Sequence, residues 1–504
     1  MTFPFRLERV LFSLTSLGAA SMMWLSPRLP MIDLPQHAAQ VALWRDLLLG
    51  QSAWADLVRI NLLTPYLLGY GLLLPLSLFF SLSTASKILL TSTLLSFVAA
   101  SMLLRREFGA DKRLDWLFLI SFFGFCWKWG FLTFLVASPL ALMMIWLALR
   151  HARAPSLGRG VVLVLLGAML LLAHGLMFLA ALGFAGLQML ETLIADRFQA
   201  FFQRSLPYVA LSMIILVFRL LTQQVNGALK MDEIEYGSAI WQRPVTLLVD
   251  IADMNDQHGT WMLPLTTIIL LLMPLSLRLG WNIHAAFVPL VGLIFILLAM
   301  PSWAFETGGL YFRFALFIPV FWALIFKSGA DVPSIEPASA KMGGLAIMLC
   351  CWTILGIQAS RIIAFSQESR SFETVLAAAE PSQRAYIMTP QAASLGAVNS
   401  DLYEHFPAWY QADKHGFVDF NFANFAPQVI RFKTDYHPIE DAHPMSDLGQ
   451  YAWTPQFIAQ YRYIFVRGST KAIEQIKSTS PCPLSLKASD GLWALLERGI
   501  CPQL

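Results

Sequence analysis

The chain has 504 residues, of which 57% are hydrophobic and 13% charged, and its mean hydropathy is +0.59. This composition excludes a water-soluble globular protein, a disordered chain and a fibrous one, and it indicates an α-helical polytopic membrane protein. The formal net charge of +3, spread over 35 basic and 32 acidic residues, provides no basic stripe and argues against nucleic-acid binding.

Charged residues are distributed unevenly along the chain. Residues 361–504 hold 26 of the 67 charged side chains in 144 positions, whereas residues 114–149 hold only Asp115 and Lys128. A segment with so little polar surface is suited to lipid contact. We therefore predict a transmembrane domain over residues 1–360 and a soluble C-terminal domain over residues 361–504.

The amino end carries the first apolar run, from Val10 to Leu25, directly after Arg6 and Arg9. Basic residues stay on the cytoplasmic side, so the chain should begin inside and emerge near Pro27. A cleaved signal peptide is the alternative, since residues 18–21 resemble a cleavage site. Because the apolar run continues beyond these residues, we predict a retained membrane anchor.

Two apolar runs follow, at residues 62–82 and 88–104, and the second ends directly on Arg105 and Arg106. If both runs crossed the membrane, these arginines would lie outside, against the positive-inside rule. The first run contains two prolines and two glycines, which suit a broken or interfacial helix. We therefore predict that only the second run is a span and that residues 27–85 form one long outer loop along the membrane.

The same rule orients the remaining apolar runs, because Arg150, Arg153 and Arg159 mark a cytoplasmic loop. About eleven transmembrane helices result, with the amino terminus cytoplasmic and the C-terminal domain extracytoplasmic. Besides residues 10–25 and 88–104, the predicted spans are residues 114–126, 131–149, 161–173, 176–193, 206–221, 262–279, 285–300, 314–326 and 342–358.

The C-terminal domain has the pattern of an α/β fold. Strand-like runs at residues 385–388 and 463–466 precede a helical pattern at residues 470–477, and residues 484–487 and 492–497 form a hairpin around Ser489-Asp490-Gly491. Cys482 and Cys501 lie at similar distances from this turn, so in an oxidising compartment they could form a disulfide. Two unpaired thiols are the alternative.

A carboxylate follows the first span closely, in the sequence Met31-Ile32-Asp33-Leu34-Pro35-Gln36-His37. Asp33 could be the N-cap of a helix, with Pro35 in the first turn and Gln36 completing a capping box. His37 lies four residues later on the same helix face, which allows either an ion pair or a catalytic pair with Asp33.

This motif, the long first outer loop, the many spans and the exterior domain together resemble the GT-C glycosyltransferases, within an uncharacterised bacterial membrane-protein branch. The resemblance implies an inverting enzyme of the bacterial inner membrane and cell envelope, with a polyprenyl-phosphate-linked sugar as donor. It also implies that Asp33 is the general base toward an acceptor hydroxyl, with His37 beside it. The family usually has two adjacent acids here, whereas Asp46 and Asp56 lie further along.

An anionic leaving group requires cations near the outer leaflet. Lys128, His174, Arg219 and Arg313 all fall near the outer ends of predicted spans, and we expect them to line one outer chamber with Asp33. Each has a structural alternative. Lys128 lies between two tryptophans, as an interfacial anchor would; Arg219 could snorkel; His174 could be a packing residue.

The outer loop at residues 222–261 is rich in acids, and comparable loops in the resembled family can bind a divalent cation. A solvated surface is the alternative interpretation. The acids are Asp232, Glu233, Glu235, Asp250, Asp253 and Asp256. Aromatic runs at residues 405–410 and 420–425 could stack on sugar rings or pack the domain. Two other functions fit the same pattern: a lipid-linked-glycan transporter or flippase, and a non-catalytic envelope assembly protein.

Overall fold

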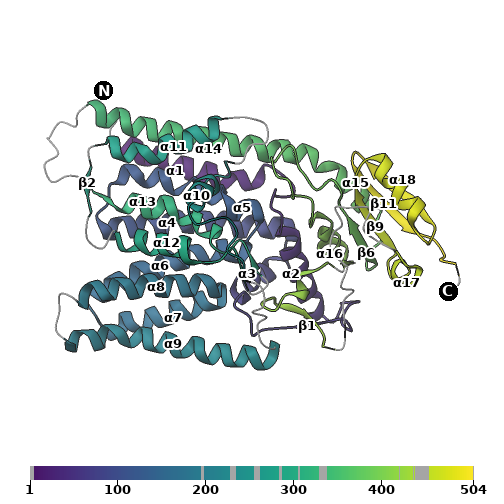
Figure 1. Ribbon diagram of the computed structural model, residues 1–504, viewed down its shortest axis with the longest axis horizontal. Helices are drawn as coiled ribbons and strands as arrows, with labels where there is room; N and C mark the ends of the chain where they lie inside the picture. Colours follow the sequence, from purple (N-terminus) through teal and green to yellow (C-terminus); the bar gives the residue numbers. More distant parts are fainter. Residues whose placement is uncertain are drawn as a thin grey trace. The chain divides into compact units, whose positions relative to one another are not determined.

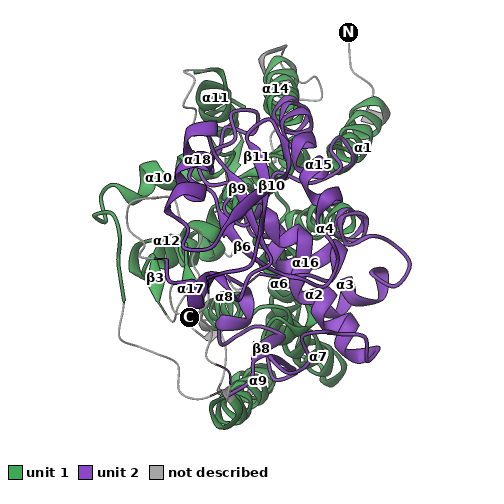
Figure 2. Cartoon of the chain, turned by 90° about the vertical axis from the view of Figure 1, so that its right-hand side faces the viewer, with its two compact units in different colours: residues 1–23, 65–69, 89–359 green, residues 24–64, 70–88, 360–504 purple. Residues whose placement is uncertain are grey.

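A computed structural model of the chain describes residues 5–193, 198–226, 234–254, 261–277, 279–282, 287–304, 307–327, 338–418, 420–434, 436 and 453–502. The chain is mostly helical and divides into two compact units, which Figure 2 shows in different colours. Unit 1 comprises residues 1–23, 65–69 and 89–359, and unit 2 comprises residues 24–64, 70–88 and 360–504. The predicted first outer loop therefore contributes most of its length to the same unit as the C-terminal region.

Unit 1 is a bundle of apolar helices whose axes run side by side in Figure 1. Two of them, α4 and α14, continue into unit 2. The helices are α1 (Phe5–Ser21), α4 (Leu82–Phe108), α6 (Leu132–Arg153), α7 (Leu157–Ala173), α8 (Gly175–Leu193), α9 (Phe198–Asn226), α11 (Met262–Ser276), α12 (Phe287–Ala299), α13 (Ile318–Leu324) and α14 (Ala338–Glu368). The short amphipathic helix α10 (Arg243–Asp250) lies between α9 and α11 in the sequence.

Four segments of described chain are long and apolar enough to cross a membrane, namely Leu82–Phe108, Leu132–Arg153, Phe201–Val225 and Met342–Ala378. A span needs about 20 residues, since each residue of an α-helix rises 1.5 Å across a core of about 30 Å. The shorter apolar helices α7, α8, α11 and α12 coincide with other predicted spans. A membrane location follows from this pattern, whereas the number eleven stays a prediction.

The predicted span at residues 114–126 differs most from the structure. In its place lie the 3₁₀ segments η2 (Lys112–Phe118) and η3 (Ser121–Phe123) and the five-residue helix α5 (Phe125–Trp129). The physical reason lies at Gly124, where a Cβ atom would meet the backbone oxygens of Asp250 and Ile251 at 2.4 and 2.3 Å. The chain must bend here to admit a second backbone, which a continuous helix would not allow.

Small residues set the helix packing in unit 1. A Cβ atom on Gly167 of α7 would lie 2.6 Å from Leu211 of α9, and one on Gly292 of α12 would lie 2.5 Å from Phe184 of α8. Bundles in lipid gain little from the hydrophobic effect between helices, so close backbone approach at small residues is the main source of contact. These glycines therefore position α7 against α9 and α12 against α8.

Unit 2 contains a five-stranded sheet in the order β10-β11-β9-β6-β7. Strand β6 is parallel to β9 and β7, whereas β9, β11 and β10 are antiparallel neighbours. The bounds are β6 (Arg384–Met388), β7 (Phe417–Val418), β9 (Tyr463–Arg467), β10 (Leu484–Asp490) and β11 (Trp493–Arg498), and α18 (Thr470–Thr479) follows β9. These elements confirm the strands, helix and hairpin predicted from periodicity.

Side chains of the sheet alternate between two cores, as the two-residue period of a strand requires. Ile464 and Val466 join an aliphatic core that contains Ile458 and Ile476. Residues of the opposite face join an aromatic core, in which Trp493 lies 4.9 Å from Phe372 of the helix α15 (Arg370–Ala378) between ring centroids. Both faces are therefore covered, and β9 is buried along its whole length.

The segments of the first loop fold together with the C-terminal region of unit 2. Strand β1 (Val58–Ile60) pairs antiparallel with β8 (Ile430–Phe432). Arg28 is 7% exposed and forms ion pairs with Glu373 at 2.8 Å and Asp413 at 2.7 Å, while its guanidinium lies over the ring of Trp409. Burying such a charge is favourable only with complete pairing, so this cluster fixes the segment after the first helix onto α15 and α16 (Trp409–Lys414).

Helix α2 (Leu34–Leu48) is joined to residues 420–430 by buried amide side chains. Gln36 donates to the Phe420 carbonyl at 2.9 Å and accepts from the Phe422 amide at 3.2 Å. Gln40 accepts from the Ile430 amide at 2.9 Å. The two glutamines thus pair with three backbone groups of this segment, as buried backbone groups require.

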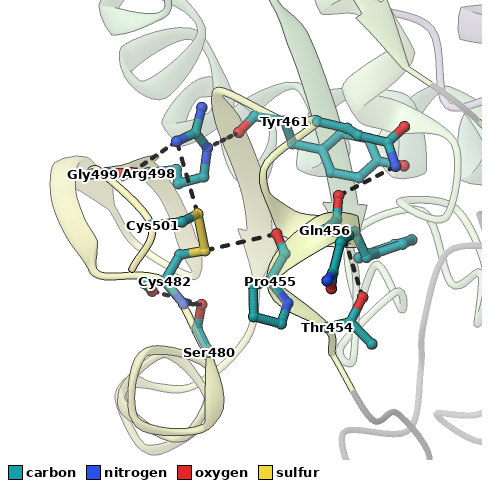
Figure 3. The surroundings of a disulfide bond; sticks show 11 residues. Thr454, Pro455, Gln456, Tyr461, Ser480, Cys482, Arg498, Gly499 and Cys501 are labelled. Carbon is teal, nitrogen blue, oxygen red and sulfur yellow. Dashed lines mark hydrogen bonds between the residues drawn. A yellow bond between two sulfur atoms is a disulfide. The ribbon is translucent and has the colours of Figure 1, made fainter. Parts of the chain in front are cut away.

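Cys482 and Cys501 are joined by a disulfide in the structure, which links the start of β10 to the end of the chain (Figure 3). Arg498 beside it donates 2.8 Å hydrogen bonds to the carbonyls of Tyr461 and Gly499. The free cysteines of the chain are Cys126, Cys350 and Cys351, and Cys126 and Cys351 are buried.

We expect Cys501→Ser to lower the unfolding free energy of unit 2 by about 3 kcal/mol, because the bridge closes a loop of about 20 residues in the unfolded chain. Thermal unfolding of the purified protein, with and without a reducing agent, measures the effect. The reductant should lower the unfolding temperature of the wild type but not of Cys501→Ser. Cys350→Ser, which removes a free thiol, is the matched control and should behave as wild type.

Candidate functional site

Asp33 lies at the N-cap position of α2, yet it does not act as a cap. In α2, all of which is described, the Asp33 side chain makes no capping hydrogen bond. Gln36, the expected partner of a capping box, is engaged by residues 420–422 instead. The Asp33 carboxylate lies 3.5 Å from Nε2 of His405, and the two side chains are 13% and 8% exposed. Asp33 is therefore a nearly buried acid paired with a histidine.

His405 is positioned by aromatic packing. It precedes the 3₁₀ turn η5 (Phe406–Ala408), and its ring lies 5.1 Å from Phe420 and 6.2 Å from Phe422 between centroids. The ring of Phe422 also makes an edge contact with His37 at 5.3 Å. His37 and His405 thus both contact Phe422, and Asp33 is paired with His405.

His37 belongs to a buried hydrogen-bond chain. Its Nδ1 lies 2.7 Å from the hydroxyl of Tyr70 on α3 (Leu67–Leu76), and that hydroxyl donates to Oε1 of Gln428 at 2.5 Å. A phenol has a single proton, so the Tyr70 oxygen must accept from His37, which places the imidazole proton on Nδ1. This chain fixes the orientation of the His37 ring one turn after Asp33.

In unit 1, Arg313 is a buried cation in a mainly aromatic environment. It lies in the 3₁₀ segment η4 (Phe312–Phe317), is 6% exposed and donates from Nη2 to the Gly308 carbonyl at 2.7 Å. Its guanidinium lies 3.8 Å from the centroid of the Phe131 ring, and it hydrogen-bonds with the Tyr66 hydroxyl. Such stacking favours arginine over lysine.

His174 reaches the same cluster from the end of α7. Its ring is 2% exposed and lies 5.0 Å from Tyr66 and 5.2 Å from Phe134 between centroids. The following residue, Gly175, begins α8, and a Cβ atom there would meet the Pro65 ring at 3.3 Å. Tyr66 is thus the common neighbour of His174 and Arg313, and we call these three residues the Tyr66 cluster.

Lys128 takes a different place in unit 1, because it forms an ion pair with Asp253 at 3.2 Å. Asp250 lies close by, and the Asp250 atom Oδ2 is buried with no hydrogen-bond partner among the described residues. Burial first, and then the charge of Asp253, raise the pKa of Asp250 to about 7, although Lys128 opposes this shift. The sequence suggested that Lys128 is either an interfacial anchor or a ligand of the donor. The structure shows a third role, as the ion-pair partner of a loop carboxylate.

Arg219 is half-buried on α9, and no contact given for the described residues joins it to the other three cations. Of the loop acids, Asp232, Glu233 and Asp256 lie outside the described residues. Within the part of the chain that is described, no three or more His, Cys, Asp or Glu side chains gather as a metal would require.

Sequence reasoning missed three residues of these clusters. His405 stood only within an aromatic run, and the partner residues Tyr66 and Tyr70 stood in the interrupted apolar run after residue 62. The aromatic runs themselves are largely packing residues, since Phe406, Trp409 and Tyr410 are fully buried. The one signal for His405 in the sequence was its place in an aromatic run. Its carboxylate partner, Asp33, lies more than 370 positions away in the chain, so the sequence could not pair them.

No protein-family model matches the sequence, and no curated relative does. Two solved structures are similar to the chain, each over 97% of its length and with a TM-score of 0.50. The first is the crystal structure of ArnT from Cupriavidus metallidurans bound to undecaprenyl phosphate, with 14% identity and 97% of that chain covered. The second is the cryo-EM structure of the arabinofuranosyltransferase AftD from Mycobacteria, with 10% identity and 41% of that chain covered. The chain has a GT-C-like fold.

This likeness confirms the resemblance inferred from the Asp33 motif and the arrangement of the spans. At these identities it concerns the fold, because catalytic residues are not carried over by architecture alone. The GT-C-like fold nevertheless extends over both units, since each match covers nearly the whole chain.

The pKa of Asp250 gives a testable pH dependence. It is raised from 3.8 to about 7, so the folded chain holds this proton more tightly than the unfolded chain. The resulting stability is complete below about pH 4 and is lost as the pH rises through about 7. We expect Asp250→Asn to raise the free energy of unfolding at pH 8 by about 2 kcal/mol and to leave it unchanged at acid pH.

Thermal unfolding in detergent at pH 5 and pH 8 measures this effect. The difference between the two unfolding temperatures should shrink in Asp250→Asn. Asp56→Asn removes an exposed carboxylate and should leave that difference as in the wild type. An equal change in both variants would refute the assignment to Asp250.

Proposed function

We propose that the chain is a glycosyltransferase that moves a sugar from a polyprenyl-phosphate-linked donor to an acceptor on the outer face of the bacterial cytoplasmic membrane. The observation that carries the proposal is the nearly buried Asp33–His405 pair at the start of α2, within a GT-C-like fold. The match to ArnT bound to undecaprenyl phosphate supports a lipid phosphate as part of the donor. The acceptor is a lipid, a glycan or a protein.

In this proposal, the Asp33 carboxylate removes the proton of the acceptor hydroxyl. The acceptor oxygen attacks the anomeric carbon as the bond from that carbon to the phosphate oxygen breaks, and the configuration inverts. The proton ends on Asp33, and the negative charge leaves on the polyprenyl phosphate. His405 holds the carboxylate through their 3.5 Å contact, whereas His37, which is held by Tyr70, orients the first turn of α2.

Binding of the donor phosphate is assigned to the Tyr66 cluster. Arg313 has a planar guanidinium with several donors, and an aromatic wall excludes water around it, so an anion there would gain a strong charge-assisted interaction. His174 would add a second donor. Lys128 is engaged with Asp253 and is assigned to the loop rather than to the donor.

The topology belongs to the same proposal. We assign eleven crossings, with the amino terminus in the cytoplasm, the C-terminal region outside, and a domain boundary near residue 360. The crossing at residues 114–126 would be made by short 3₁₀ and α segments, which are buried and so would not expose unsatisfied backbone groups to lipid. Reporter fusions after residues 27 and 360 test this orientation.

The central test compares Asp33→Asn with Asp46→Asn. Asp46 lies on the same helix and also pairs with a histidine, His415, at 2.6 Å, so its variant removes the same charge and the same kind of contact. Purified protein reconstituted in sealed proteoliposomes would receive radiolabelled polyprenyl-phosphate sugars. We expect Asp33→Asn to reduce kcat by about a thousandfold, as loss of a general base does, and Asp46→Asn to stay within about threefold.

Equal turnover in the wild type and Asp33→Asn would remove the catalytic assignment and leave the fold untouched. Donor that crosses the bilayer without sugar transfer would support the transporter or flippase instead. Absence of both transfer and transport, with all tested donors, would favour the assembly protein.

Donor binding gives a separate prediction. Arg313→Lys keeps the charge but loses the planar fork and the stacking on Phe131, so we expect the KM for the donor to rise by roughly ten- to a hundredfold with a smaller change in kcat. Arg219→Lys is the matched control on the half-buried α9 position and should alter the KM by less than about threefold. Equal effects would place donor binding elsewhere.

A further inference from the structure

A half-open cleft of about 600 Å³ lies among the end of α6, the start of α7 and the start of α9, all in unit 1. Its walls are mostly apolar and include Val161 and Val164 of α7 and Leu206 and Ala210 of α9. It is separate from the Tyr66 cluster, with which it shares no lining residue. The proposed sugar transfer assigns no role to it.

One polar side chain in this cleft is buried. His151 is 2% exposed and lines the cleft, and neither of its ring nitrogens has a hydrogen-bond partner of ordinary geometry among the described residues. The backbones of Gln203 and Arg204 both approach the ring, without a hydrogen bond of ordinary geometry. A buried imidazole whose N–H has no hydrogen-bond acceptor destabilises the fold by about 1–3 kcal/mol. A ligand that accepted a hydrogen bond from this N–H would recover that energy.

The surroundings of His151 are basic. Arg159 and Arg204 lie close enough to act on the imidazole electrostatically. On the neighbouring turn, Arg150 and Arg153 share the single carboxylate of Glu107, at 3.8 and 2.9 Å. The start of α7 also faces the cleft through its N-cap Ser156, and the positive end of a 17-residue helix favours an anion.

The cleft continues onto apolar surface. Leu157, Leu165 and Leu206 line it and are 82%, 59% and 65% exposed. A free phosphate would use the basic end only, whereas an amphiphile would use both the basic end and the apolar walls. Clusters of basic residues between helix ends at the cytoplasmic surface are typical of sites for anionic lipid head groups.

We propose that this cleft binds an anionic phospholipid of the leaflet that adjoins Arg150 and Arg153, with the phosphate at His151 and an acyl chain along α7 and α9. By the positive-inside rule this leaflet is the cytoplasmic one. The lipid would hold α6, α7 and α9 together at an end where Gly160 of α7 already approaches Pro207 of α9.

Native mass spectrometry of the delipidated full chain tests the proposal, with phosphatidylglycerol and phosphatidylethanolamine of identical acyl chains as probes. Ala210→Phe fills the cleft, and His151→Leu removes its polar group. We expect His151→Leu to weaken phosphatidylglycerol binding by roughly tenfold, the loss expected for one charge-assisted hydrogen bond. Ala210→Phe should weaken it by roughly tenfold or more, because the added ring occupies the space of the acyl chain. Val162→Phe, on the exposed face of α7, adds the same bulk outside the cleft and should bind as wild type.

The wild type should also prefer phosphatidylglycerol over phosphatidylethanolamine by roughly tenfold. Equal binding of the two lipids would overturn the assignment of the head group to His151. Equal losses in Ala210→Phe and Val162→Phe would overturn the assignment to this cleft. Thermal unfolding checks that each variant folds. If His151→Leu does not fold, His151→Ala replaces it, and if Ala210→Phe does not fold, Val164→Phe replaces it as the variant that fills the cleft. Sugar transfer is not read out, so failure here leaves the proposed enzymatic function untouched.

Discussion

The site in unit 2 depends on the hydrogen bonds that Gln36 and Gln40 make with the backbone of residues 420–430. This segment is mostly irregular and partly buried, so its buried amides and carbonyls must find partners or cost the energy of desolvation. The two glutamines supply those partners from one face of α2. Asp33, at the start of the same helix, is thereby held near Phe420 and Phe422, the rings that position His405.

Unit 1 uses buried arginines in two distinct ways. Arg243 is fully buried and donates to the carbonyls of Leu297, Leu298 and Met300, so it caps the carboxyl end of α12. Its guanidinium thus has a structural role, as a donor to backbone carbonyls. Arg313 lies over the ring of Phe131, donates to the Gly308 carbonyl and hydrogen-bonds with Tyr66, whose ring also packs against His174. Arg243 also lies over the ring of Tyr311, at 4.4 Å, so the two settings share aromatic stacking. They differ in that Arg243 donates to the last carbonyls of a helix, whereas Arg313 hydrogen-bonds with a tyrosine side chain.

The sequence predicted what local periodicity determines. The strands β6, β9, β10 and β11 and the helix α18 lie where alternation and turn residues placed them. It failed where distant backbone decides the structure. The chain bends at Gly124 because the backbone of residues 250–251 occupies the space beside it. Asp33 forms no capping box because the Gln36 side chain hydrogen-bonds with the backbone of residues 420–422. His405 could not be assigned because its partner lies far away in the chain.

The interleaving of unit 2 bears on what the C-terminal region does. An appended module for partner binding would make most of its contacts within its own residues. Here, however, β8 pairs with β1 of the first loop, and Glu373 and Asp413 form ion pairs with Arg28 of that loop. Removal of that region would leave Arg28 as a buried charge without its acids and would expose the amides of α2. The C-terminal region is thus a structural part of the environment of Asp33.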